Sequence, residues 1–202
     1  MASSIIHMAV AKEMNKKLKK DESKLLLGSI APDLSKLVGE TKKYSHFLDD
    51  NNKVDLNKFL AKYQKYLNDD FVLGYYIHLY TDYLWFKYFI TEIVDNDKIK
   101  KLDGTIVKLN GEMARLYIYN DYTNLNEKLV AQYNLDLNEL NNIEVSNIIN
   151  EIPLDKISLL LEQIKIINEN INKPKNFCFN IENINNFIET SSELILATLK
   201  NI

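Results

Sequence analysis

The sequence predicts an all-α fold, organised as a single multi-helix domain over residues 1–202. Residues that break helices are scarce, with 5 Gly and 3 Pro, and the Val/Thr alternation typical of strands is rare. A hydrophobic fraction of 46% and a charged fraction of 26% are ordinary for a globular chain and argue against disorder. No internal repeat or Gly/Ser linker divides the sequence, so one domain is the simplest count.

The first two helices are predicted from caps and periodicity. The first should begin at Ser3 or at the serine after it, since Ser is a good N-cap residue and apolar residues then recur every three or four positions. That spacing places His7 on the inward face. A second helix is expected over 23–31 and should end before Pro32, because the residue before a proline avoids helical dihedrals. Asp33 would then lie on the exit turn.

A buried helix is predicted in the middle of the chain. A polar loop leads to His46, and the spacing of apolar residues over 56–67 predicts an amphipathic helix. Residues 71–90 are apolar nearly all round, which is typical of a central, buried helix. His78 and Asp82 interrupt this segment and are four residues apart, so they share one helix face.

The other elements have weaker signals. We expect loops at 95–101, helices at 106–117, 125–133, 157–167 and 184–199, and an extended segment at 177–181. The aromatic side chains of the central helix are expected in the core rather than as a stacking platform for bases or acyl chains: Tyr75, Tyr76, Tyr83, Trp85 and Tyr88.

Charge and cysteine content limit the function classes. With 25 Lys+Arg against 28 Asp+Glu the formal charge is -3, which provides no global basic field for nucleic acid. The single cysteine excludes a disulfide framework and a multi-cysteine zinc site. No apolar stretch is long enough for a transmembrane helix, and the first residues lack the basic region of a signal peptide. A cytoplasmic protein is therefore expected.

The histidines are the informative residues. All three lie within the first 78 residues. His78 and Asp82, with Cβ atoms about 6 Å apart on one helix face, could bind one metal ion together. Burying this pair in an apolar helix is costly unless it has a partner. Either a divalent metal or a direct His–Asp hydrogen bond would offset that cost, and the residues alone leave both open.

The motifs around these residues resemble one known family. Ser-Ser-Ile-Ile-His7, Gly-Ser-Ile-Ala-Pro-Asp33, Tyr-Ser-His46-Phe and His78-Leu-Tyr-Thr-Asp82-Tyr-Leu-Trp together look like the bacterial zinc-dependent phospholipase C family. That family shares its all-helical fold with fungal single-strand nucleases. The resemblance covers about the first 90 residues, and its most specific part is the His-x-x-x-Asp-x-x-Trp element.

The resemblance implies a set of metal ligands. His46, His78 and Asp82 match the ligands of one zinc ion, and Asp33 matches an acidic residue that completes its shell or acts as the base. His7 matches a ligand of a neighbouring zinc ion, with Asp82 bridging the two. In the secreted relatives an N-terminal residue also contacts that second ion, whereas six residues precede His7 here.

This chain departs from the family at a third zinc site. The secreted relatives use two further histidines and a glutamate there, but no histidine follows His78. We therefore expect one or two ions. Glu112 and Asp121 could supply replacement oxygens, or could be solvated helix or turn carboxylates.

The predicted activity is hydrolysis of a phosphate ester, a phosphodiester, phosphomonoester or phospholipid, by metal-activated water. The donor set suits Zn²⁺, with Mn²⁺, Fe²⁺ or Ni²⁺ as alternatives. Asp33 is the catalytic candidate, orienting or deprotonating the water. The candidates for contacting the phosphate are Lys36, Lys42, Lys43, Tyr44 and Ser45.

Three other interpretations compete with this one. A phosphohydrolase of the HD type needs an adjacent His-Asp pair, and no histidine here is followed by Asp. A non-catalytic helical protein could use the metal only as a structural site, or as part of a binding module. A helical interaction protein without metal would need only a hydrogen bond between His78 and Asp82.

Overall fold

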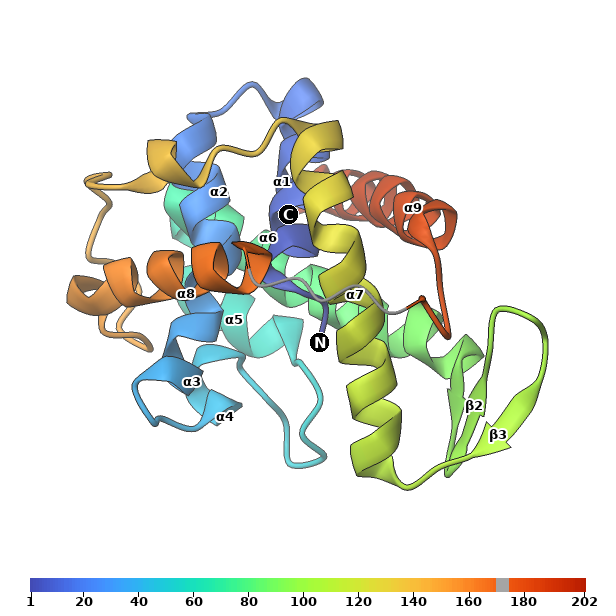
Figure 1. The fold of residues 1–202 in the computed structure, drawn as a ribbon. Coiled ribbons are helices and arrows are strands. Elements are labelled where there is room, and N and C mark those ends of the chain that lie inside the picture. The colour runs from blue at the N-terminus through green and yellow to red at the C-terminus, as the bar shows by residue number, and fades with distance from the viewer. Residues whose placement is uncertain (170–174) are drawn as a thin grey trace.

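The computed structural model describes residues 1–169 and 175–202 and is predominantly helical, which confirms the predicted all-α class (Figure 1). Its α-helices are α1 (Ser4–Leu18), α2 (Glu22–Ile30), α3 (Leu34–Leu37), α4 (Lys42–Ser45), α5 (Leu56–Tyr63), α6 (Asp70–Leu84), α7 (Gly111–Tyr133), α8 (Ile157–Glu169) and α9 (Ile181–Leu199). Among the described residues, no helix is both long and apolar enough to cross a bilayer.

The first helices begin and end close to the predicted positions. Ser3 is the N-cap of α1, and its hydroxyl accepts a hydrogen bond from the backbone N–H of Ile6. Helix α2 ends at Ile30, one residue before the predicted end. The prediction that the residue before Pro32 avoids helical dihedrals is wrong. Ala31 keeps them (φ -54°, ψ -36°) and begins a 3-10 turn over Ala31–Asp33.

A small antiparallel sheet replaces the loop predicted at 95–101 and the start of the helix predicted at 106–117. Its strands are β1 (Val94–Asp95), β2 (Lys98–Lys100) and β3 (Ile106–Lys108), in the order β1-β2-β3. Ile99 is buried between two exposed lysines, opposite Val94 on one side and Val107 on the other. This short in-out alternation, with a left-handed Gly104 (φ 83°) in the β2–β3 connection, favours strands over a helix.

The two helices predicted at 106–117 and 125–133 are one helix, α7, which begins at Gly111 (Figure 1). Polar residues Asp121, Asn124 and Asn126 are buried in its middle, so the apolar periodicity is interrupted although the backbone is continuous. The segment predicted to be extended at 177–181 forms a bend, and its last residue already belongs to α9.

The core is built on α1, α2 and α6, and α2 crosses α6 at unusually short distance. A Cβ atom on Gly74 would lie 2.1 Å from the carbonyl oxygen of Leu25, and one on Gly28 would lie 2.1 Å from that of Phe71. Only glycine allows the two backbones to approach this closely. The crossing places the end of α2 beside the middle of α6.

The aromatic residues of the central helix largely pack as predicted. Tyr75, Tyr76 and Trp85 are buried, but Tyr83 is half-buried and Tyr88 is 50% exposed. Helix α6 widens after Leu84 into a π-helical turn over Trp85–Phe89, which rotates the later side chains out of register with the buried face.

Candidate metal centre

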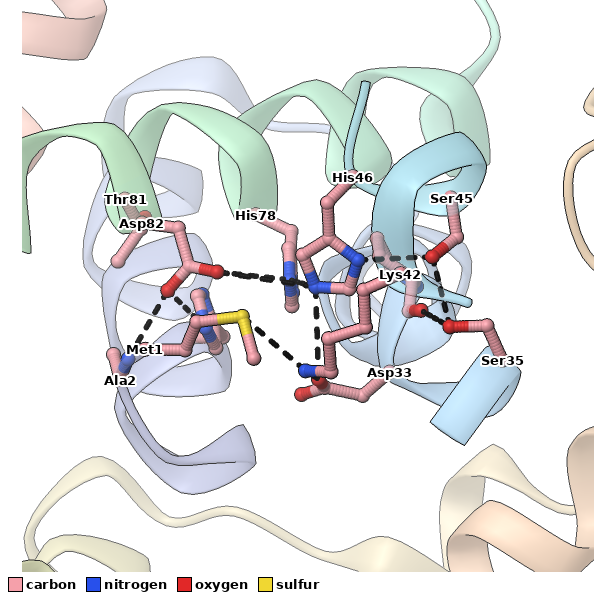
Figure 2. A network of polar contacts seen from close by, with 12 residues as sticks. Met1, Ala2, Asp33, Ser35, Lys42, Ser45, His46, His78, Thr81 and Asp82 are labelled. Carbon is pink, nitrogen blue, oxygen red and sulfur yellow. Dashed lines mark hydrogen bonds and ion pairs between the residues drawn. The ribbon is translucent and has the colours of Figure 1, made fainter. Parts of the chain in front are cut away.

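The five side chains predicted as metal ligands come together in the structure. His7 lies on α1, Asp33 on the turn after α2, His46 directly after α4, and His78 and Asp82 on α6. Asp33 retains 17% side-chain exposure, and the other four side chains are fully buried. Five residues from separate parts of the fold therefore form one largely buried polar cluster, most of which is seen in Figure 2.

One side of the cluster brings three ligand atoms together. The Nε2 atoms of His46 and His78 are 3.2 Å apart, and they lie 3.9 Å and 3.7 Å from Oδ2 of Asp82. All three atoms are close enough to one another to share one metal ion. The 3.7 Å separation is too long for the His78–Asp82 hydrogen bond that a metal-free interpretation requires.

The other side of the cluster surrounds the second oxygen of Asp82. Oδ1 is 3.4 Å from Nε2 of His7 and accepts a 3.0 Å hydrogen bond from the backbone N–H of Ala2. The two oxygens of Asp82 thus face two sets of neighbours, an arrangement that suits a bridging carboxylate. The segment that precedes His7 in the sequence runs directly past this second side (Figure 2).

Several buried atoms in the cluster lack hydrogen-bond partners. Both ring nitrogens of His7 and Oδ2 of Asp82 are buried without a hydrogen bond to the described residues, and the His7 ring stacks on His78 with centroids 3.8 Å apart. Unsatisfied buried polar atoms are costly. Imidazole nitrogens and carboxylate oxygens are ligands that zinc accepts. A divalent cation would satisfy Oδ2 of Asp82 or Nε2 of His7, so the residues present fit a metal site.

Asp33 connects the cluster to the surface. Its Oδ1 lies 3.7 Å from Nε2 of His46 and accepts a 2.7 Å hydrogen bond from the Lys42 ammonium. A second possible ligand group combines Asp33 with His7 and His78. The Asp33 side chain makes no helix-cap hydrogen bond, so it is available to the site.

Local structure orients the histidines. The ring N–H at Nδ1 of His78 donates to the carbonyl oxygen of Ser29, at 2.8 Å, which leaves Nε2 directed into the cluster. Nδ1 of His46 lies 2.9 Å from the hydroxyl of Ser45. The next residue, Phe47, has a left-handed backbone (φ 51°) and is buried against Phe59, so the chain reverses immediately after His46.

Burial and charge set the protonation states of the cluster. Burial raises the pKa of Asp33, but His46 and Lys42 outweigh that effect and hold the pKa well below its usual value. Burial likewise raises the pKa of Asp82, and His7 reverses the shift to a net lowering. Burial and the neighbouring His7 together hold the pKa of His78 well below normal. At neutral pH these ligands are therefore carboxylates and a neutral imidazole, the forms that bind metals.

A cavity of about 150 Å³ reaches the cluster at Asp33. Lys36 and Lys42 line it, whereas the Lys43 ammonium lies 3.8 Å from the fully exposed Asp50.

The two other candidates for phosphate contact are Tyr44 and Ser45. Tyr44 is 68% exposed, and Ser45 is buried with its hydroxyl already bonded to His46 and Ser35. The placement of Ser45 is therefore that of a partner for His46.

The two later acids lie outside the cluster's ligand groups. Glu112 is exposed on the first turn of α7. Asp121 is fully buried, so its interpretation as a solvated carboxylate is wrong. Its oxygens accept hydrogen bonds from the backbone N–H groups of Phe177, Cys178 and Phe179, and it thereby holds the segment that leads into α9.

Sequence reasoning missed the groups that support the ligands. The Ser29 carbonyl and the Ala2 N–H belong to the backbone and have no sequence signal. Ser35, whose hydroxyl contacts that of Ser45 at 2.8 Å, lies ten residues from its partner. Its position only two residues after Asp33 was the one available hint.

Comparison with known protein families gives a match to this sequence. The family model described as zinc dependent phospholipase C matches residues 3–85, the segment that contains all five clustered residues. No curated protein matches the chain, and no solved structure matches it. The resemblance predicted from the motifs is thereby confirmed, and residues 3–85 of this chain carry the sequence pattern of the zinc-dependent phospholipase C family.

Proposed function

We propose that this protein is a metal-dependent hydrolase of phosphate esters, with zinc as the preferred ion. The observation that carries the proposal is a cavity lined by Asp33, a member of the His/Asp cluster, and by two lysines. A purely structural metal site is usually closed, whereas a catalytic site keeps an open position. We place that open position at the edge of the cluster where Asp33 lines the cavity.

The ligands divide between the two sides of Asp82. His46, His78 and Oδ2 of Asp82 would hold one ion, while His7 and Oδ1 would hold a second. A bound divalent cation supplies acidified water and neutralises charge on the phosphate oxygens. Asp33, ionised and at the edge of the cavity, is placed to orient a water molecule and accept its proton.

The lining of the cavity includes both cationic and apolar side chains. Lys36 and Lys42 provide positive charge next to Asp33, and the apolar side chains come from one face of α8: Leu160, Ile164 and Ile167. A phosphate group would lie against the lysines, with the ester's organic part against α8. The proposed substrate is therefore a small phosphate ester, or the headgroup end of a phospholipid.

Neighbouring lysines provide a matched test of phosphate binding. Lys42→Met should lower kcat/KM about 10- to 150-fold, because a hydrogen bond to a charged group contributes about 1.5–3 kcal/mol. Lys43→Met should stay within about twofold of the wild type, since its ammonium faces the exposed Asp50. Steady-state kinetics of both variants would check this, and equal losses would remove Lys42 from the phosphate site.

The proposed activity is tested by a substrate screen on protein of measured metal content. Nitrophenyl phosphate mono- and diesters, phosphatidylcholine vesicles, nucleotides and single-stranded nucleic acid would be compared, with Asp33→Asn as the inactive control. We expect turnover of at least one phosphate ester, reduced about 100-fold or more in the variant, the range typical for loss of a general base.

The screen also tests the competing interpretation. Bound metal without turnover of any phosphate ester would reject the hydrolase and favour a structural metal or a metal-dependent binding module. Turnover that is equal in the wild type and in Asp33→Asn would keep the hydrolase but reject the role of Asp33.

A further inference from the structure

We infer that Ser45 and Ser35 are positioning residues that hold His46 in the tautomer whose bare Nε2 faces the metal centre. The inference rests on the proposed metal site but concerns residues outside its ligand set. It begins from a chain of three buried contacts: His46 Nδ1 to Ser45 Oγ at 2.9 Å, Ser45 Oγ to Ser35 Oγ at 2.8 Å, and Ser35 Oγ to the Pro32 carbonyl at 3.2 Å.

The direction of this chain follows from its last member. The carbonyl oxygen of Pro32 can only accept, so the hydroxyl of Ser35 must donate its one proton to it. Ser35 can then only accept from Ser45, and Ser45 in turn can only accept from His46. One arrangement satisfies all three contacts, and in it Nδ1 of His46 carries the proton.

The consequence lies at the opposite ring nitrogen. With the proton on Nδ1, Nε2 of His46 is a bare lone pair directed into the cluster. Nε2 of His78 is also bare, because Nδ1 of that ring donates to Ser29. Two lone pairs thus face each other across 3.2 Å, an arrangement that is unfavourable unless a cation lies between them.

Without the serines a competing arrangement becomes available. His46 could carry its proton on Nε2 and donate it to Nε2 of His78, closing the site with a histidine–histidine hydrogen bond. The Ser45–Ser35 chain (Figure 2) opposes that state by requiring the proton at Nδ1. Tyr75 supports this arrangement, because its hydroxyl donates to the Ser45 carbonyl at 2.6 Å.

The first measurement is zinc affinity by competition with a chromophoric chelator. Ser45→Ala should bind zinc about 10- to 100-fold more weakly than the wild type, the range typical for loss of a ligand's outer partner, and Ser35→Ala should show a smaller loss. Ser192→Ala is the matched control, because its buried hydroxyl donates to the carbonyl oxygens of Ile188 and Val10 rather than to a group of the cluster. Unchanged affinity in Ser45→Ala would overturn the inference.

The second measurement is the tautomer itself, from long-range ¹H–¹⁵N correlation spectra of metal-free protein. We expect the wild-type His46 to carry its proton on Nδ1, and Ser45→Ala to show population of the Nε2–H form. A wild-type His46 protonated at Nε2 would overturn the inference, even if Ser45→Ala does not fold. Absence of zinc binding by the wild type would instead reject the metal centre, so the two failures are distinguishable.

Discussion

Asp82→Asn is expected to abolish stoichiometric metal binding. Asp82 faces both sides of the cluster, with Oδ2 toward His46 and His78 and Oδ1 toward His7. The amide keeps the shape but removes the charge, and it replaces one oxygen by an N–H donor that cannot ligate a cation. We expect affinity for either ion to fall more than about 100-fold, beyond the loss typical of an outer partner.

Elemental analysis of protein purified without added metal would measure this effect. The wild type should contain about one or two ions per chain, given the number of ligands, and Asp82→Asn almost none. Asp121→Asn is the control. Asp121 is equally buried, but its oxygens accept hydrogen bonds from the backbone N–H groups of residues 177–179 and it lies outside the cluster. It should keep its metal while losing about 1–3 kcal/mol of stability. Full metal content in Asp82→Asn would refute the assignment.

Gly74→Ala is expected to cause the largest loss of stability. The added Cβ would lie 2.1 Å from the Leu25 carbonyl oxygen and 3.0 Å from Cα of Gly28. Both atoms belong to the backbone of α2, so the helices must separate rather than one side chain turn away. Overpacking typically costs about 1–3 kcal/mol, and a contact with backbone atoms belongs at the upper end, where about 3 kcal/mol corresponds to a decrease in Tm of about 6–12 °C for a chain of this size.

Thermal unfolding of Gly74→Ala and Gly111→Ala would separate backbone contact from helix propensity. A Cβ on Gly111, at the start of α7, meets nothing within 4 Å. Its replacement should therefore be neutral or slightly stabilising, since alanine is the better helix former. If both variants melt at or above the wild-type temperature, the close crossing of α2 and α6 does not exist as described.

The same crossing links the fold to the site. It places the carbonyl of Ser29, one residue after Gly28, within 2.8 Å of Nδ1 of His78 on α6. A wider separation of the helices would remove that partner. We therefore interpret Gly28 and Gly74 as the residues whose close approach brings the outer partner of His78 to its ring.

Local signals explain what could be predicted from the sequence. A serine cap and apolar spacing indicated α1 and the inward face of His7, and the separation of His78 and Asp82 indicated that they share a face. The sheet at 94–108 was missed because its strands have only two or three residues each. Helix α7 was divided because buried polar residues such as Asp121 interrupt its periodicity.

The sequence by itself therefore determined the helical class, because helical periodicity is a local property of the chain, whereas the set of five ligands was implied by the family resemblance of its motifs. Only the tertiary structure decided which neighbouring side chains contact the cluster. It shows that Lys42 contacts Asp33, whereas Lys43 faces Asp50. It also assigned Ser45 to His46 rather than to a phosphate. These outcomes depend on the direction in which each side chain of the segment after α2 points once the helices have packed, and no periodic pattern encodes that direction.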